Sequence, residues 1–273
     1  MAIRIVQSKQ NARVKELRAA LLRPPRGNAG AIGLEGLNLV TEATQSGLQI
    51  TSVFVATGHE NLLETLRLPA SVELLSMSAE ILASAVTTEA PQPIAALAHP
   101  PVWTWETVFT GQTRESAQPL IVVLAGIQDP GNLGTIIRSA EAFGASCAIS
   151  LPGTVSQWNP KASRASAGSV FRLPILTATP DECFNRLHTA RIQTIAAMAH
   201  DATPLDQQNL FLPTAFLIGS EGSGLSPELA ARCDARVTIP CPGPVESLNA
   251  AVAASILLYE AARQASRERG RTQ

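Results

Sequence analysis

The stretch Ile239–Glu260, IPCPGPVESLNAAVAASILLYE, decides how the rest of the sequence is interpreted. Its first half has a proline at every second position from 240 to 244, and prolines remove backbone donors and fix φ, so we expect an irregular loop. Ser247 or Glu246 is the expected cap of a helix that starts at about Leu248. The residues at helical spacing are Leu248, Val252, Ser255, Ile256 and Tyr259. A rigid loop entering such a helix suits a ligand or partner site, but a buried strand–loop–helix junction has the same pattern.

A second stretch, Leu120–Gly144, combines a buried strand with a polar turn. Leu120–Ala125 is a continuous apolar, β-branched run, which is typical of a strand buried in a parallel sheet. A turn cluster follows, and then Gly134–Phe143 has the apolar spacing of a helix. Asn132 lies at the start of that helix. Arg138 follows six residues later, so the two side chains do not lie on one face of the helix.

A third stretch, Ala215–Leu225 or AFLIGSEGSGL, is another short apolar strand that runs into a glycine-rich turn. The turn has one carboxylate, Glu221, and glycines at 219, 222 and 224, where backbone can approach a ligand because no Cβ is present. The second and third stretches both place polar groups at the carboxyl ends of parallel strands. Open α/β sheets bind their ligands there.

These three blocks, in this order, resemble the three motifs of the SpoU-TrmH family of RNA 2′-O-ribose methyltransferases, in the SPOUT superfamily. The matching blocks are DPGNLGTIIRSAEAFGA at Asp129–Ala145, IGSEGSGLSPEL at Ile218–Leu229 and IPCPGPVESLNAAVA at Ile239–Ala253. The resemblance implies an α/β fold, with a C-terminal SPOUT domain that has a parallel sheet and a deep trefoil knot. It also implies a small α/β RNA-binding domain in front, similar to ribosomal RNA-binding proteins, and a homodimer.

The resemblance implies S-adenosylmethionine as the cofactor, bound through backbone groups at Gly219, Ile239 and Leu248. It assigns the catalytic positions to Arg138, Asn132, Glu221, Ser247 and Asn249. A guanidinium stays protonated in proteins, so we expect Arg138 to stabilise the developing alkoxide and not to act as a base. The two asparagines would orient Arg138 or the ribose, Ser247 would fix the loop, and Glu221 would hold the motif-two loop or pair with Arg138.

Charge is unevenly distributed along the chain, although the net charge is only −1. Residues 1–30 have seven basic groups against one acidic group, and residues 31–110 have one arginine against eight glutamates. This segregation fits either a solvated surface or contact with RNA phosphates. Ser8 is the expected cap of a helix in this basic arm. The expected RNA-binding residues are Lys9, Asn11, Arg13 and Lys15 in the arm, and Lys161 and Arg164 in the family-like NPKASRASAG segment. For Lys161 and Arg164 the alternative is an exposed helix with solvated charges.

The length and the alternation of short elements predict two domains. We expect residues 1–110 to form the RNA-binding domain, residues 111–118 a linker and residues 119–273 the methyltransferase domain. The expected helices are Asn38–Ser46, Asn61–Leu66, Ser78–Val86 and Asp181–His188, and the further expected strands are Ile50–Ala56, Val72–Leu75, Ile94–Ala98, Ala148–Leu151 and Ile192–Ala199. The phrases EGLNLVTEA and TTEAPQPIAALA are similar to the family's substrate-binding domain, except that Pro93 stands where the family usually has glycine.

Several classes of protein are disfavoured. The four cysteines have no CxxC or other metal-ligand spacing, which indicates reduced thiols in a cytoplasmic protein without a metal site. No apolar run is long enough to span a bilayer. A dehydrogenase is disfavoured because no GxGxxG follows the first strand. Two functions therefore remain: an RNA 2′-O-ribose methyltransferase, with ribosomal RNA ahead of transfer RNA as substrate, or a non-catalytic RNA-binding or ribosome-associated relative.

Overall fold

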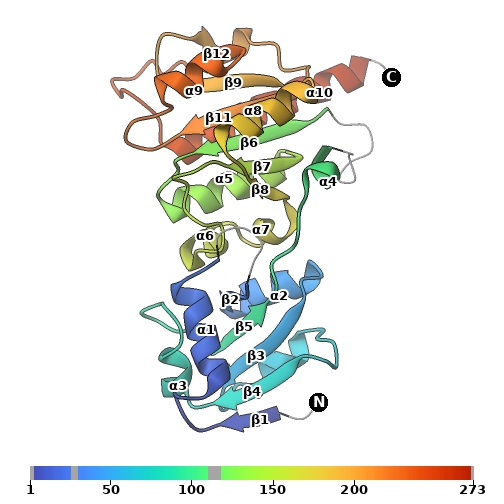
Figure 1. The fold of residues 1–273 in the computed structure, drawn as a ribbon, viewed down its shortest axis with the longest axis vertical. Coiled ribbons are helices and arrows are strands. Elements are labelled where there is room, and N and C mark those ends of the chain that lie inside the picture. Colours follow the sequence, from blue (N-terminus) through green and yellow to red (C-terminus); the bar gives the residue numbers. More distant parts are fainter. Residues whose placement is uncertain (1–2, 26–29, 110–117, 272–273) are drawn as a thin grey trace. The chain divides into compact units, whose positions relative to one another are not determined.

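The structure is a computed structural model, and it describes residues 3–25, 30–109 and 118–271. By their contacts the residues divide into two compact units: Met1–Val102 with Ser156–Arg172, and Trp103–Val155 with Leu173–Gln273. Each unit has its own β-sheet (Figure 1). The predicted linker at 111–118 falls almost wholly outside the described residues, so the domain limits stay a prediction.

The first unit is built on a five-stranded sheet in the order β1-β4-β3-β5-β2. The strands are β1 (Ile3–Val6), β2 (Ile32–Glu35), β3 (Ile50–Ala56), β4 (Glu73–Met77) and β5 (Ile94–Ala98). β1, β4 and β3 run parallel, whereas β5 is antiparallel to both β3 and β2. The helices of this part are α1 (Ala12–Leu22), α2 (Leu37–Gln45), the 3₁₀ turn η1 (Glu60–Thr65) and α3 (Ala79–Ala83). The helix predicted at residues 61–66 is present one residue earlier, and it has the tighter 3₁₀ winding.

The basic arm starts its helix at a different residue from the one predicted. The side chain of Asn11 accepts a hydrogen bond from the N–H of Arg13 at 2.9 Å and so caps α1. Ser8 lies in the preceding turn, where its hydroxyl accepts from the N–H of Gln10. The predicted Ser8 cap is therefore wrong, because the asparagine beside the first helical residue already satisfies a free N–H of the first turn.

One segment from the middle of the sequence also belongs to the first unit. It contains α6 (Pro160–Ala165) and α7 (Ser169–Arg172), and α6 packs against the edge strand β2. Trp158 and Phe171, both 3% exposed, stack with ring centroids 6.4 Å apart. The segment is thus folded into this unit although the chain around it belongs to the other.

The second unit is built on a seven-stranded, wholly parallel sheet in the order β10-β12-β9-β11-β6-β7-β8 (Figure 1). The strands are β6 (Leu120–Ala125), β7 (Cys147–Ser150), β8 (Ile175–Thr177), β9 (Gln193–Met198), β10 (Thr203–Pro204), β11 (Thr214–Gly219) and β12 (Ala235–Thr238). The helices are α4 (Trp105–Phe109), α5 (Pro130–Ala142), α8 (Pro180–Thr189), the 3₁₀ turn η2 (Leu205–Gln207), α9 (Pro227–Arg232) and α10 (Ala250–Arg271). The parallel α/β fold predicted for this region is confirmed, and the trefoil knot stays a prediction.

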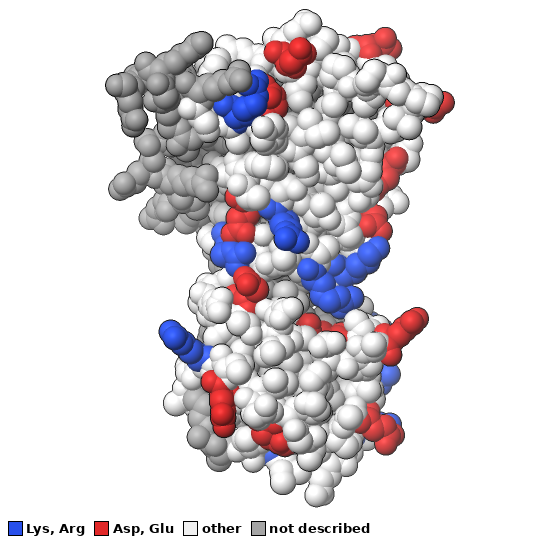
Figure 2. All heavy atoms as spheres, turned by 180° about the vertical axis from the view of Figure 1, so that it is seen from behind, with Lys and Arg blue, Asp and Glu red and all other residues white. Residues whose placement is uncertain are grey.

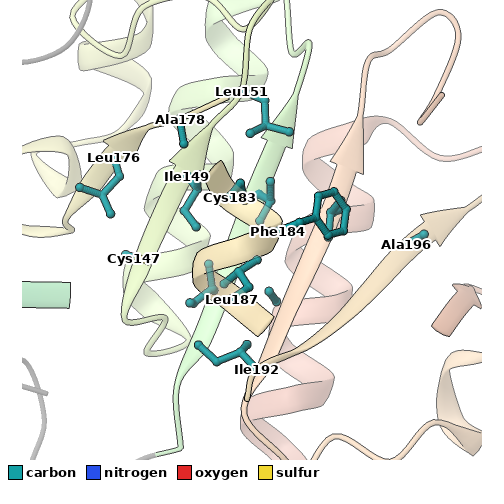
Figure 3. Packing of buried hydrophobic residues seen from close by; sticks show 14 of the residues in the cluster. Cys147, Ile149, Leu151, Leu176, Ala178, Cys183, Phe184, Leu187, Ile192 and Ala196 are labelled. Carbon is teal, nitrogen blue, oxygen red and sulfur yellow. The ribbon is translucent and has the colours of Figure 1, made fainter. Parts of the chain in front are cut away.

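Side chains of alternating strand positions divide between the two faces of this sheet, because successive residues of a strand point to opposite sides. On one face, Cys183, Phe184 and Leu187 of α8 pack into a cluster with Ile149 and other strand residues, as Figure 3 shows. The helices α5 and α10 contact each other and also contact strands of the sheet. The core therefore holds the strand ends in fixed register around the polar loops that follow them.

The predicted start and buried face of the last helix are both wrong. α10 begins at Ala250, and the side chain of Asn249, not Ser247 or Glu246, accepts from the N–H groups of Ala251 and Val252. Of the face predicted from apolar spacing, Val252 is 48% exposed and Tyr259 is 52% exposed. The buried residues of the helix include two leucines and four alanines: Leu257, Leu258, Ala250, Ala251, Ala254 and Ala261. The small side chains let α10 lie close to its neighbours, whereas Val252 and Tyr259 are exposed.

Two classes of feature are absent from the part of the chain that the structure describes. None of its helices is long and apolar enough to cross a membrane. Its His, Cys, Asp and Glu side chains also form no group of three or more that is suited to hold a metal ion.

The capping assignment is testable with two matched alanine variants. Asn11→Ala should lower the free energy of unfolding of the first unit by about 1 kcal/mol, because the first turn of α1 loses its side-chain acceptor. Ser8→Ala should change it by less than about 0.5 kcal/mol, as for an ordinary exposed position. Urea denaturation of both variants checks this, and equal destabilisation would contradict it.

Candidate active site

A cleft of about 600 Å³ opens at the carboxyl ends of β9, β11 and β12 and at the start of α10. Five of the predicted site residues line it: Gly219, Glu221, Ile239, Ser247 and Leu248. All three predicted cofactor-binding positions are among them. The cleft thus lies where the sequence predicted a ligand site, beyond the carboxyl ends of parallel strands.

The motif-two turn closes back on its own strand. Ser220 and Gly224 exchange backbone hydrogen bonds of 3.0 Å, and Gly224 has φ +67°, a conformation that favours glycine. A Cβ on Gly219 would lie 2.1 Å from backbone atoms of Gly224 and Leu225. The turn itself therefore requires glycine at 219, which is a second reason beside the predicted approach of a ligand.

Glu221 joins the three motifs through hydrogen bonds. Its carboxylate accepts from the N–H groups of Gln128 and Asp129, each at 3.2 Å, and from the side-chain amide of Asn132 at 2.9 Å. The Oδ1 of Asn132 in turn accepts from the side-chain amide of Asn249 at 3.0 Å. Motif two is thereby tied to motif one, and motif one to the first residue before α10.

The same hydrogen bonds keep the Glu221 carboxyl ionised. Partial burial raises its pKa, but the bonds from Asn132, Gln128 and Asp129, together with a backbone bond of its own residue, outweigh this and hold the pKa below its ordinary value. Because the folded-state pKa is depressed, the stabilisation is present at neutral pH and is lost as pH falls through the folded pKa. The link between the motifs is therefore a charged one under physiological conditions.

Arg138 is not part of this network. It is exposed on α5, and within the described residues no hydrogen bond or ion pair joins it to Glu221 or to either asparagine. Of the two roles predicted for Glu221, the structure therefore has the loop contact and not the pair with Arg138. The asparagines orient each other and Glu221, and the exposed side chain of Ser247 caps no helix.

The cleft lining has a definite electrostatic character. Three carboxylates, Asp201, Glu221 and Glu246, are among the lining residues, and no Lys or Arg is. Apolar side chains such as Ile218 and Leu257 supply the rest of the wall. A cleft with this lining suits a ligand that has an apolar or aromatic part and a positive charge.

Two residues outside the three motifs also contribute to the cleft and were not predicted as site residues. His200 and Asp201, which follow β9, are exposed and line its rim. Asp201 has φ +54°, which is uncommon for a residue with a Cβ. The available signal was their position directly after a strand of the parallel sheet.

Most of the predicted RNA-binding residues have charged or hydrogen-bonding partners within the first unit. Lys9 pairs with Glu80 at 2.7 Å, and Arg13 pairs with Glu16 and Glu73, each at 2.8 Å. Glutamates among residues 31–110 thus pair with basic residues of the arm, residues 1–30. Pairing within the folded unit is a third alternative to a solvated surface or RNA contact. Figure 2 shows blue and red side chains next to one another on the face that it presents.

Asn11 caps α1, and Arg164 lies 3.8 Å from the carboxylate of Glu35, so neither is an uncommitted surface group. Lys161 is exposed, and its backbone N–H donates to Asn159. Among the predicted residues of the arm, Lys15 is exposed and has no ion pair within the described part of the chain. Arg18, one turn further along α1, is also exposed and was missed.

The four thiols differ in burial, and this difference allows a test of the cleft. Burial raises the pKa of Cys147 strongly and that of Cys183 and Cys233 to about 12, whereas Cys241 is exposed and lines the cleft. Thiolates are the reactive form. A maleimide should therefore label one thiol per native chain, and none in Cys241→Ser, as counted by intact-mass spectrometry. More than one label on the native protein would contradict this arrangement.

Comparison with known proteins agrees with the motifs. Residues 119–259 match the model of the SpoU rRNA Methylase family, and residues 11–96 match the MRM3-like substrate binding domain. The chain is 29% identical over 258 residues to the 23S rRNA (guanosine(2553)-2′-O)-methyltransferase RlmP of Bacillus subtilis, covering 93% of this chain and 97% of that protein. It is 34% identical over 267 residues to an uncharacterized tRNA/rRNA methyltransferase of Synechocystis, covering 95% and 93%.

Solved structures give the same result over nearly the whole chain. The SpoU methyltransferase AviRb from Streptomyces viridochromogenes, in complex with the cofactor AdoMet, superimposes with a TM-score of 0.80 at 30% identity, covering 93% of this chain and 98% of that one. An AdoMet-bound rRNA methyltransferase from Sinorhizobium meliloti gives a TM-score of 0.81 at 29% identity, covering 96% and 98%. The chain therefore belongs to the SpoU rRNA methylase family and is an RNA methyltransferase.

Proposed function

We propose that this protein transfers a methyl group from S-adenosylmethionine to the 2′-hydroxyl of a ribose in ribosomal RNA. The observation that carries the proposal is the cleft lined by residues of motifs two and three, which the hydrogen bonds from Asn132 to Glu221 and from Asn249 to Asn132 tie to motif one. The relative from Bacillus subtilis acts on 23S rRNA, which favours ribosomal over transfer RNA. A ribosomal RNA substrate implies that the protein is located in the cytoplasm.

The lining of the cleft fits this methyl donor. The donor has an adenine ring and a positively charged sulfonium, and the cleft offers apolar walls and carboxylates without a lysine or arginine. Gly219, Ile239 and Leu248 would hold it through their backbone groups. When bound, S-adenosylmethionine supplies an electrophilic methyl group.

Arg138 is the residue that we assign to the reacting hydroxyl. Its guanidinium is permanently charged and cannot take a proton, so its contribution is to stabilise negative charge that develops on the ribose oxygen. It is exposed and has no ion pair in the described part of the chain, so it is available to RNA. Asn132 and Asn249 keep the adjacent loops in position, and the proton passes to solvent or to an RNA phosphate.

The protein acts as a homodimer in this proposal, and the outer face of α10 supports it. Val252 and Tyr259 are large apolar side chains exposed on one helix, and Tyr259 packs edge-on against Phe143 with ring centroids 5.7 Å apart. The hydroxyls of Ser139 and Ser255 are 2.7 Å apart, so α5 and α10 form one continuous surface. A second copy that covers this surface buries apolar area that is otherwise in contact with water.

The RNA surface includes the exposed cations of α1. Lys15 and Arg18 lie three residues apart on the helix and therefore on neighbouring positions of one face. Lys9 and Arg13, in contrast, have carboxylate partners and contribute first to the fold of the first unit. The matched substrate-binding model, which covers residues 11–96, includes this helix.

The catalytic assignment is tested by methyl transfer to ribosomal RNA. Arg138→Ala should lower kcat by about 100- to 1,000-fold, as for loss of a donor to a developing oxyanion. Binding of S-adenosylhomocysteine, measured by calorimetry, should be unchanged because Arg138 does not line the cleft. Thr135→Ala, on the exposed side of the same helix, is the control and should keep its activity. Transfer by Arg138→Ala at the wild-type rate would remove Arg138 from its role, and wild-type protein that binds RNA without transferring methyl would favour the non-catalytic alternative.

The dimer is tested by placing a charge on the exposed stripe. Val252→Glu should convert the protein from dimer to monomer in light scattering, because an unpaired carboxylate would be buried at the interface. Val102→Glu, at an apolar position that is 71% exposed in the first unit, should leave the mass unchanged. A wild-type protein that is monomeric at micromolar concentration would contradict this part of the proposal.

A further inference from the structure

The segment Ser156–Arg172 carries an assignment that neither the sequence motifs nor the comparisons give. It lies inside the range of the methylase model, residues 119–259, but by its contacts it belongs to the unit that also contains the substrate-binding model. Its two basic residues with carboxylate partners, Arg164 and Arg172, pair with residues 35 and 42 of that unit. These pairs join parts of the chain that are 129 or more residues apart.

The first pair involves a buried carboxylate. The side chain of Glu35 is 2% exposed, Thr88 donates to its Oε1, and its Oε2 is buried without a hydrogen-bond partner. The Nη1 of Arg164 lies 3.8 Å from that Oε2. A buried carboxylate is strongly destabilising unless an opposite charge is close, so this guanidinium has a role inside the protein.

The second pair sits at a tight turn. Ala167 and Gly168 have φ +49° and φ +86°, and a Cβ on Gly168 would lie 2.6 Å from the Oε2 of Glu42. The same oxygen accepts from Arg172 at 2.6 Å, and Arg172 also reaches the hydroxyl of Ser46 at 3.3 Å. The backbone thus approaches α2 at the one residue of the turn without a side chain.

Packing supports the two pairs along the segment. Small residues of α6 and of its C-terminal cap are fully or almost fully buried: Ala162, Ser163 and Ser166. The hydroxyl of Ser156 donates to the carbonyl of Pro25 at 2.7 Å, just beyond the end of α1. The segment is therefore fixed to the first unit at its beginning, its middle and its end.

We propose that Ser156–Arg172 is a docking element, a stretch of the methylase range that Arg164 and Arg172 hold in the first unit as positioning residues and not as phosphate contacts. The chain enters this element from Val155 and leaves it at Leu173, both in the second unit. None of its residues lines the cofactor cleft, so loss of these contacts leaves the cleft intact. The kinetic part of this inference rests on the proposed function, whereas the structural part does not.

Arg172 and Glu42 form the more exposed pair, and exchanging their charges distinguishes a docking role of Arg172 from contact with RNA. Arg172→Glu should raise hydrogen exchange of amides in residues 156–172 by about fivefold, as expected for loss of one ion pair and its replacement by repulsion. It should lower kcat/KM for ribosomal RNA by a similar factor and leave the Kd for S-adenosylhomocysteine unchanged. The double variant Glu42→Arg/Arg172→Glu should return exchange and kcat/KM to within about twofold of wild type.

The salt dependence of RNA affinity tests the alternative that Arg172 contacts a phosphate. If Arg172 contacts a phosphate, the slope of log affinity for RNA against log salt should fall by about 0.7 to 0.9, and the charge swap should not restore it. In the docking account the swapped protein has the wild-type slope. A swap that fails to restore exchange, or a reduced slope that persists in it, would overturn the proposal.

The buried pair provides a second test and a control. Arg164→Met should raise exchange of the segment and lower the thermal midpoint, and Glu35→Gln/Arg164→Met should recover part of both, because the uncompensated carboxylate is gone. Arg4→Glu, which breaks an ion pair with Glu73 in the same unit, should leave exchange of residues 156–172 unchanged. If Arg164→Met has no effect on exchange, Arg164 is not a docking residue. If exchange responds as stated but wild-type protein methylates no RNA, the docking element stands and the proposed function falls.

Discussion

The carboxylate of Glu221 is the contact on which the rest of the site depends. It accepts hydrogen bonds from Gln128, Asp129 and Asn132, which lie 89 to 93 residues away in the sequence. Two of these donors are backbone N–H groups at the start of α5, where a negative charge is favoured by the free donors and the helix dipole. Asn132 then binds Asn249, which caps α10. Three loops that share no local sequence are thereby held at one end of the parallel sheet.

The electrostatics of the cleft follow from this arrangement. The carboxylate that joins the loops also faces the cleft, so the structural charge and the charge available to a cationic ligand are the same group. Arg138, the cation that we propose to stabilise charge on the ribose oxygen, is exposed on α5 and lies outside the cleft lining. In the proposed mechanism the cleft can therefore favour a sulfonium while the arginine stays available to RNA.

Sequence predicted those parts of the fold that local pattern determines. The strands β6, β3 and β5 were predicted to the residue, because apolar and β-branched residues make up nearly all of each. The strand β12, with the sequence ARVT, was missed because four residues with one buried apolar position give no periodic signal. On α10 the large apolar residues were taken as the core, whereas its alanines are buried by close helix packing.

The sequence predicted which motif residues lie close together, but not the hydrogen bonds that connect them. Motif resemblance named Asn132, Glu221 and Asn249 together, yet their hydrogen bonds depend on tertiary contacts that no local pattern encodes. The ion pairs of the basic arm were not predicted for the same reason, since the partners of Lys9 and Arg13 lie about 60 to 70 residues away among residues 31–110. The charge runs alone indicated only a solvated surface or contact with RNA.

The central claim is that the ends of β9, β11 and β12, joined through Glu221, form the binding site of the methyl donor. A crystal structure of the protein with S-adenosylhomocysteine tests it most directly. The account predicts the ligand within the cleft, in contact with the backbone at Gly219, Ile239 and Leu248. Density for the ligand at any other place, with this cleft filled only by water, would contradict it.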